Sequence, residues 1–140
     1  MTLYAESSAV LSWLLGETLG VKMAQELAKA EMIFSSSLTL IECDRSLIRA
    51  WSTKRLAKAK AASLKRVLAA AASRWAMIAI DDKVIERARQ PFFSEPIRTL
   101  DAIHLASALA VKDAIPDLEI LSLDDRVRSA AKVSGIPCRP

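Results

Sequence analysis

Four acidic residues stand in apolar segments of this sequence, where their neighbours predict burial. They are Glu6 in LYAESSAVLSWLL, Glu42 in LTLIECDRSL, Asp101 in RTLDAIHLASALAV and Asp124 in EILSLDDRV. A carboxylate buried alone is very costly, so each needs a hydrogen-bonding partner, a proton or a metal ion. If the fold gathers the four, their oxygens make a site for a hard divalent cation.

The elements that must position these acids follow from an alternation of β-like and helical runs. We expect strands at 2–5, 32–35, 77–80, 119–123 and 136–138. We expect helices through residue 15, over 17–30, 38–51 and 54–73, through 89, from a cap at Thr99 through 111, and over 126–134. This alternation predicts an α/β sandwich with a mostly parallel sheet of about five strands. With 140 residues, the chain is expected to form one domain, 1–140.

Three of the acids are expected to lie at the same edge of the sheet. In an open parallel sheet, ligands bind outside the carboxyl ends of the strands. Glu6 follows the first strand and Asp124 follows the fourth, while Asp101 lies in the first turn of an apolar helix. Helix capping explains each of the three separately, and the helix dipole favours such an anion by roughly 0.3–1 kcal/mol.

Spacing does not select the members of this acidic edge. Glu42 lies one turn before Arg45, so a surface ion pair also accounts for it. Asp81 and Asp82 follow the third expected strand and meet the strand-end criterion equally well. The pattern therefore predicts an acidic sheet edge and leaves its composition open.

Charge is distributed unevenly along the chain, whose formal net charge is +4. Between residues 45 and 74 there are nine basic residues and no acidic one. Such a stretch is either a solvated helix face or a footprint for a phosphate backbone.

No apolar run approaches the ~20 residues that a membrane span needs, and the start lacks the pattern of a signal peptide. Cys43 and Cys138 fit no metal or redox spacing, so we expect reduced thiols in the cytoplasm.

Four segments, taken in order, resemble the PIN-domain ribonucleases, specifically the VapC-type toxins of toxin–antitoxin pairs. These segments are LYAESSAVLSWLLGE, LIECDRSL, RTLDAIHLASAL and ILSLDDRVRSAAKVSGI, and the likeness that they carry extends over nearly the whole chain. The resemblance implies a PIN-like three-layer α/β/α sandwich. It also implies a Mg²⁺- or Mn²⁺-dependent endoribonuclease that a cognate antitoxin holds inactive. A homodimer or a toxin–antitoxin hetero-oligomer is expected on the same ground, with no membrane partner.

The same resemblance assigns roles to residues of this chain. Glu6 and Asp101 are expected to bind the metal directly, with Glu42 and Asp124 as outer ligands or water-positioning bases. Ser7 and Ser122 are expected to orient these ligands through hydrogen bonds. The basic stretch, with Arg45, Arg49, Lys54 and Lys58 as the candidates, is expected to hold the RNA substrate. The first acid of the family is normally Asp, and here it is Glu6.

Other interpretations remain open at the level of the sequence. His104, the only histidine, is interpreted as a packed or ligand-supporting residue rather than as a sole general base. A catalytically degenerate PIN-fold module that binds RNA or a partner is the alternative function, motivated by the glutamate at position 6. A phospho-acceptor receiver domain would need an acidic pair after the first strand and a lysine after a late one, and the sequence offers neither.

Overall fold

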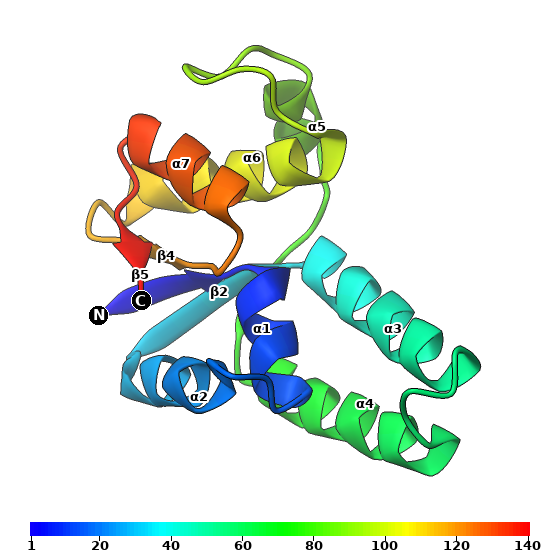
Figure 1. Ribbon diagram of the computed structural model, residues 1–140. Coiled ribbons are helices and arrows are strands. Elements are labelled where there is room, and N and C mark those ends of the chain that lie inside the picture. The colour runs from blue at the N-terminus through cyan, green and yellow to red at the C-terminus, as the bar shows by residue number, and fades with distance from the viewer.

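A parallel sheet of five strands forms the centre of the computed structural model, which describes all 140 residues (Figure 1). The strands are β1 (Thr2–Ala5), β2 (Met32–Ser36), β3 (Ala76–Ile78), β4 (Glu119–Leu121) and β5 (Cys138–Arg139). Their order is β3-β2-β1-β4-β5, and every neighbouring pair is parallel. The predicted parallel sheet is therefore confirmed.

Helices lie on both faces of the sheet and give three layers (Figure 1). They are α1 (Ser7–Leu14), α2 (Gly20–Lys29), α3 (Ser37–Ser52), α4 (Lys58–Ala72), α5 (Asp82–Ala88), α6 (Thr99–Ala114) and α7 (Asp125–Val133). In the view shown, α6 and α7 lie above the sheet, and α1, α2 and α4 lie below it. No helix is long and apolar enough to cross a membrane.

Each face of the sheet packs its own apolar core. The larger core joins Tyr4 and Ile120 of the sheet to Leu105 of α6 and Val127 of α7, all of them essentially inaccessible to solvent. Two smaller clusters pack α1, α2, α3 and α4 against the other face. Because α6 is covered on most sides, its nearly continuous apolar sequence is explained by burial.

Three helix starts differ from the sequence expectation, and the first is that of α2, expected from residue 17 and found at Gly20. The helix predicted from Lys54 begins at Lys58, because Lys54 has a left-handed backbone with φ 61° and the chain turns back there. The amide of Arg55 donates to the carbonyl of Ala50 at 2.9 Å, which closes α3. Thr99 was predicted to cap α6 and is instead its first residue. Arg98 occupies the cap position without a side-chain capping bond.

The order of the strands places a topological switch point between β1 and β4. The chain leaves β1 toward β2 and β3 on one side, and β4 then adds to the other side of β1. Ala5 pairs with Leu121, and the amide of Glu6 donates to the carbonyl of Leu121 at 3.0 Å. The chain segments that follow β1 and β4 diverge at this point. Open parallel sheets bind ligands in such a crevice.

Candidate functional site

Glu6 begins the site at the end of β1, where it caps α1. Its side chain is buried, with only 5% of the residue exposed. Oε1 accepts a hydrogen bond from Ser7 Oγ at 2.9 Å, and Oε2 accepts from Ser122 Oγ at 2.7 Å. The amide and the hydroxyl of Ser8 also donate to Oε2. Capping therefore does apply to Glu6, and three serines fix the direction in which its carboxylate points.

Glu42 reaches the same place from the middle of α3. Its Oε1 accepts from His104 Nε2 at 2.6 Å and also lies 2.9 Å from Ser7 Oγ, whose single proton is shared between Glu42 and Glu6. The alternative explanation, an ion pair with Arg45, is wrong. Burial raises the pKa of Glu42, but the hydrogen bonds from His104 and Ser7, with the charge of Arg98, together lower this pKa below its ordinary value. The residue therefore stays ionised near neutral pH.

His104 is packed between Glu42 and the sheet, with 1% of its surface exposed. Its Nδ1 lies 2.8 Å from the hydroxyl of Tyr4 on β1. Burial, followed by the charge of Glu6, raises the pKa of Tyr4 far above its ordinary value, so the phenol keeps its proton. An ionised carboxylate only accepts, so Nε2–H donates to Glu42 and Nδ1 can accept from Tyr4. The structure thus agrees with the interpretation of His104 as a packed, ligand-supporting residue.

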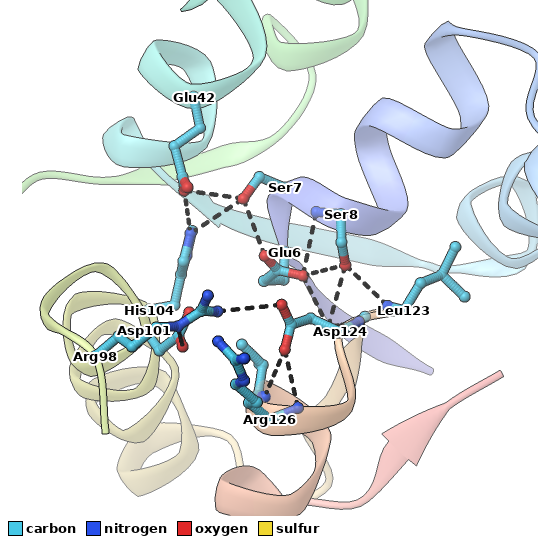
Figure 2. A network of polar contacts seen from close by, with 12 residues as sticks. Glu6, Ser7, Ser8, Glu42, Arg98, Asp101, His104, Leu123, Asp124 and Arg126 are labelled. Carbon is cyan, nitrogen blue, oxygen red and sulfur yellow. Dashed lines mark hydrogen bonds and ion pairs between the residues drawn. The ribbon is translucent and has the colours of Figure 1, made fainter. Parts of the chain in front are cut away.

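Asp101 and Asp124 approach each other from α6 and α7 with an arginine between them (Figure 2). Arg98 Nε donates to Asp101 Oδ2 at 2.7 Å, and Arg98 Nη2 donates to Asp124 Oδ2 at 3.3 Å. Asp124 Oδ1 caps α7 through the amides of Arg126 and Val127. The hydrogen bond and charge of Asp101, assisted by Asp124, raise the pKa of Arg98 above its ordinary value.

These contacts join all four predicted acids in one polar network (Figure 2). Ser7 links Glu6 to Glu42. Ser122 Oγ donates to Glu6 and accepts from the amide of Asp124 at 3.1 Å. Asp81, the competing candidate, lies outside the network and caps α5 through the amide of Val84. The fold therefore brings together the set of acids that the resemblance selected.

Three further residues of this network, Arg98, Ser8 and Tyr4, were not predicted from the sequence. Ser8 lies next to Ser7, so the paired serines after Glu6 were an available signal. Arg98 sits three residues before Asp101, a spacing that brings side chains together on a helix. Tyr4 carried no comparable signal, because its partner His104 is 100 residues away in the sequence.

Comparison with known proteins assigns the chain to a family. The sequence matches the PIN domain family over residues 3–133. The chain belongs to the PIN-domain family. No curated protein matches the sequence with significance. The family assignment therefore comes from the domain match, and solved structures add the likeness in fold.

Several solved toxin–antitoxin structures share the fold of this PIN domain. VapBC2 from Rickettsia felis, bound to a DNA fragment from its promoter, has a TM-score of 0.66 and 14% identity, covering 99% of this chain and 98% of that one. VapC20 from Mycobacterium tuberculosis, a sarcin-ricin loop cleaving toxin, has a TM-score of 0.65 and 16% identity, with 99% of each chain covered. A Klebsiella pneumoniae toxin–antitoxin complex has a TM-score of 0.63 and 18% identity, covering 100% and 97%. At these identities the likeness establishes the fold.

The acids of this PIN domain offer the right donor atoms for Mg²⁺ or Mn²⁺, with one obstacle. All four are carboxylates, and hard oxygen ligands suit these ions. Asp101 Oδ1 and Glu42 Oε2 accept no hydrogen bond from the protein. Yet no three acidic, histidine or cysteine side chains converge closely enough to hold an ion, and Arg98 lies between two of the acids. The donor chemistry fits the metal, while the ligand assignments stay predictions.

One large surface hollow of the PIN domain does not lie at the acids. It measures about 750 Å³ and is lined by apolar residues of α2, α4 and β2, together with Trp13 and Trp75. A smaller hollow of about 370 Å³ is lined by one of the four acids, Asp101, together with Arg98. Catalytic and ligand sites need convergent polar groups as well as concavity. We therefore place the candidate site at the polar network of the four acids (Figure 2) and not at the apolar hollow.

The candidate RNA-binding residues lie along the helical pair α3 and α4, which extends away from the sheet in Figure 1. Arg45 and Arg49 are exposed and follow Glu42 by one and two turns of α3. Lys54 and Lys58 are exposed at the far end of the pair, and Lys58 Nζ lies 4.9 Å from the ring of Trp51. A basic strip thus leads away from the acids, and its contact with RNA stays a prediction.

Proposed function

We propose that this PIN domain is a Mg²⁺- or Mn²⁺-dependent endoribonuclease that hydrolyses RNA phosphodiester bonds and serves as the toxin of a toxin–antitoxin pair. One observation carries the proposal: four acids from four separate segments meet in one hydrogen-bonded network at the switch point of the sheet. Membership of the PIN family supports this assignment. The basic strip on α3 gives a place for a polyanionic substrate next to the acids.

The residues of the network would have two roles, holding the ion and fixing the carboxylates that hold it. Glu6 and Asp101 would hold the ion, with Glu42 and Asp124 contributing outer contacts. A bound Mg²⁺ or Mn²⁺ would supply positive charge against the phosphate and make water more acidic. Ser7 and Ser122 fix the carboxylate of Glu6, and His104 fixes that of Glu42. Held in this way, the carboxylates need little reorganisation when a substrate arrives.

The partner of the proposed toxin is a cognate antitoxin. Structural neighbours of this chain were solved as toxin–antitoxin assemblies, which supports extending such a partner to this protein. A homodimer, or a hetero-oligomer with the antitoxin, would follow the same pattern. RNA and a protein inhibitor meet in the cytoplasm, which is where we place the activity.

Replacing Asp101 by asparagine tests the enzymatic proposal. Asp101→Asn removes one charge from the ion's ligands, and we expect metal-stimulated cleavage of a labelled RNA to fall by on the order of a hundredfold or more. Asp113→Asn is the matched control, because Asp113 lies exposed on the same helix without an ion pair. Cleavage that persists in EDTA, or that is insensitive to Asp101→Asn, would rule the proposal out.

A degenerate PIN module that binds RNA without cleaving it is the second candidate. Its support is that both oxygens of Glu6 are occupied by serine donors and that Arg98 neutralises two further acids. RNA binding by the unmodified protein without Mn²⁺- or Mg²⁺-stimulated cleavage would favour this candidate. Expression in cells adds a second readout: a toxin should arrest growth, and co-expression of a small protein encoded next to its gene should relieve the arrest.

A further inference from the structure

Arg98 occupies the space between two of the four acids. Its Nε and Nη2 contact Oδ2 of Asp101 and of Asp124, at 2.7 and 3.3 Å. Figure 2 shows the guanidinium lying across the gap between the two carboxylates. A cation that used both carboxylates as ligands would need this same space. The arginine and a metal ion are therefore alternative partners for the pair.

In the metal-free protein, Arg98 offsets the repulsion between the carboxylates of Asp101 and Asp124. Two carboxylates held close together repel each other, and the repulsion is stronger where water is partly excluded. A guanidinium presents a rigid fork of donors that can serve two carboxylates at once. Asp101 is nearly buried, with 8% of its surface exposed. Its charge thus needs a partner even when no metal is bound.

Arg98 can leave this position without disturbing the core. Its side chain is 54% exposed, and it precedes α6 at the cap position without contributing a capping bond. The guanidinium can therefore turn into water, while a bound cation would replace it as the partner of the nearly buried Asp101. Displacement of the side chain therefore requires no change in the helices that carry the acids.

We propose that Arg98 is a built-in counter-ion for Asp101 and Asp124, which a divalent cation must displace in order to bind. This inference rests on the proposed metal site and does not require RNA cleavage. The contacts of Arg98 stabilise the metal-free protein and weaken its affinity for a divalent cation. Binding of the ion is then an exchange of one cationic partner for another.

Titration of metal-free protein with Mn²⁺ alone, followed by calorimetry or electron paramagnetic resonance, tests the exchange. We expect Arg98→Gln to bind Mn²⁺ roughly tenfold more tightly than the unmodified protein. Arg126→Gln is the matched control, because it removes the same charge two residues from Asp124. Arg126 is exposed and forms no ion pair. We expect its affinity to change by less than about twofold.

A second variant separates the charge of Arg98 from the shape of its guanidinium, and the melting temperature gives a second readout. Arg98→Lys keeps the charge but lacks the fork, so its Mn²⁺ affinity should fall between the other two. Without metal, Arg98→Gln should melt at a lower temperature than Arg126→Gln, and saturating Mn²⁺ should remove the difference. Unchanged or weaker Mn²⁺ binding by Arg98→Gln, an equal effect of Arg126→Gln, or no Mn²⁺ binding by any variant would overturn the inference. Tighter binding without any RNA cleavage would uphold it and contradict the proposed enzymatic function alone.

Discussion

At the scale of single residues, the site is organised by hydroxyl and imidazole donors as much as by its acids. Ser7 contacts both Glu6 and Glu42, and Ser122 holds the other oxygen of Glu6. His104 connects Glu42 to the hydroxyl of Tyr4. Each donor removes a direction in which a carboxylate could turn. The extra methylene of a glutamate at position 6 is accommodated by this set of serine contacts.

Tyr4→Phe tests the buried contact between the Tyr4 hydroxyl and His104. The change removes one hydroxyl and leaves Nδ1 of the buried His104 without a partner. Leaving a buried polar atom unsatisfied costs about 1–3 kcal/mol, so we expect the free energy of unfolding to fall by that amount in chemical denaturation. Phe34→Leu, in the neighbouring strand, controls for a loss of packing alone. Equal stability of Tyr4→Phe and the unmodified protein would show that the hydroxyl contributes nothing to holding His104.

At the scale of elements, close packing of α1 on α2 fixes how the first helix leaves the site. Gly20 begins α2, and a Cβ at this position would lie 2.6 Å from the backbone carbonyl oxygen of Ser12. A backbone atom cannot move aside as a flexible side chain can. The glycine therefore permits α2 to cross directly against α1, whose first turn carries Ser7 and Ser8.

Gly20→Ala separates packing from helix propensity. Propensity alone favours alanine by about 1 kcal/mol in a helix interior. The clash with Ser12 predicts the opposite, a loss of about 1–3 kcal/mol in the free energy of unfolding, measured by urea denaturation. Val21→Ala is the control, because this neighbour is 72% exposed and should change stability by less than about 0.5 kcal/mol. A stabilised Gly20→Ala would mean that the two helices are not packed this closely.

At the scale of the whole molecule, opposite charges are separated in space. The acids lie at the switch point of the sheet, and the basic residues of α3 and α4 lie along the helical pair that extends from it (Figure 1). A polyanion attracted to the basic strip would be guided toward the acids, where its charge is unfavourable unless a cation is present. Substrate binding and metal binding should therefore support each other.

The double variant Arg45→Gln/Arg49→Gln tests this distribution of charge. Removing two phosphate contacts should lower the slope of log affinity against log salt by about 1.4 for single-stranded RNA. Lys29→Gln/Lys132→Gln removes the same charge from exposed positions on α2 and α7 and should change the slope much less. Fluorescence anisotropy with a short labelled RNA measures both. Equal slopes for the two double variants would indicate that RNA does not contact α3.

Much of the sheet could be predicted because strands and helices leave local signals. The alternation of short β-like runs with longer helical ones was sufficient to predict five parallel strands. Element ends were less accurate, as Lys54 and Thr99 show, because the turn at Lys54 depends on how α3 and α4 pack. The acidic edge was predicted as a pattern, and the resemblance, rather than spacing, selected Glu42 over Asp81.

The sequence by itself determined which chemical groups are available: four carboxylates in apolar surroundings, a basic stretch without acids, and an α/β alternation that orients strand ends toward one edge. Only the tertiary structure decided which groups meet. Ser7 meets Glu42 across 35 residues, and Arg98 reaches Asp124 across 26. Such contacts depend on the order of strands in the sheet, which is a property of the packed chain. For that reason the acids could be found by reading the sequence, and the arginine that occupies the space between them could not.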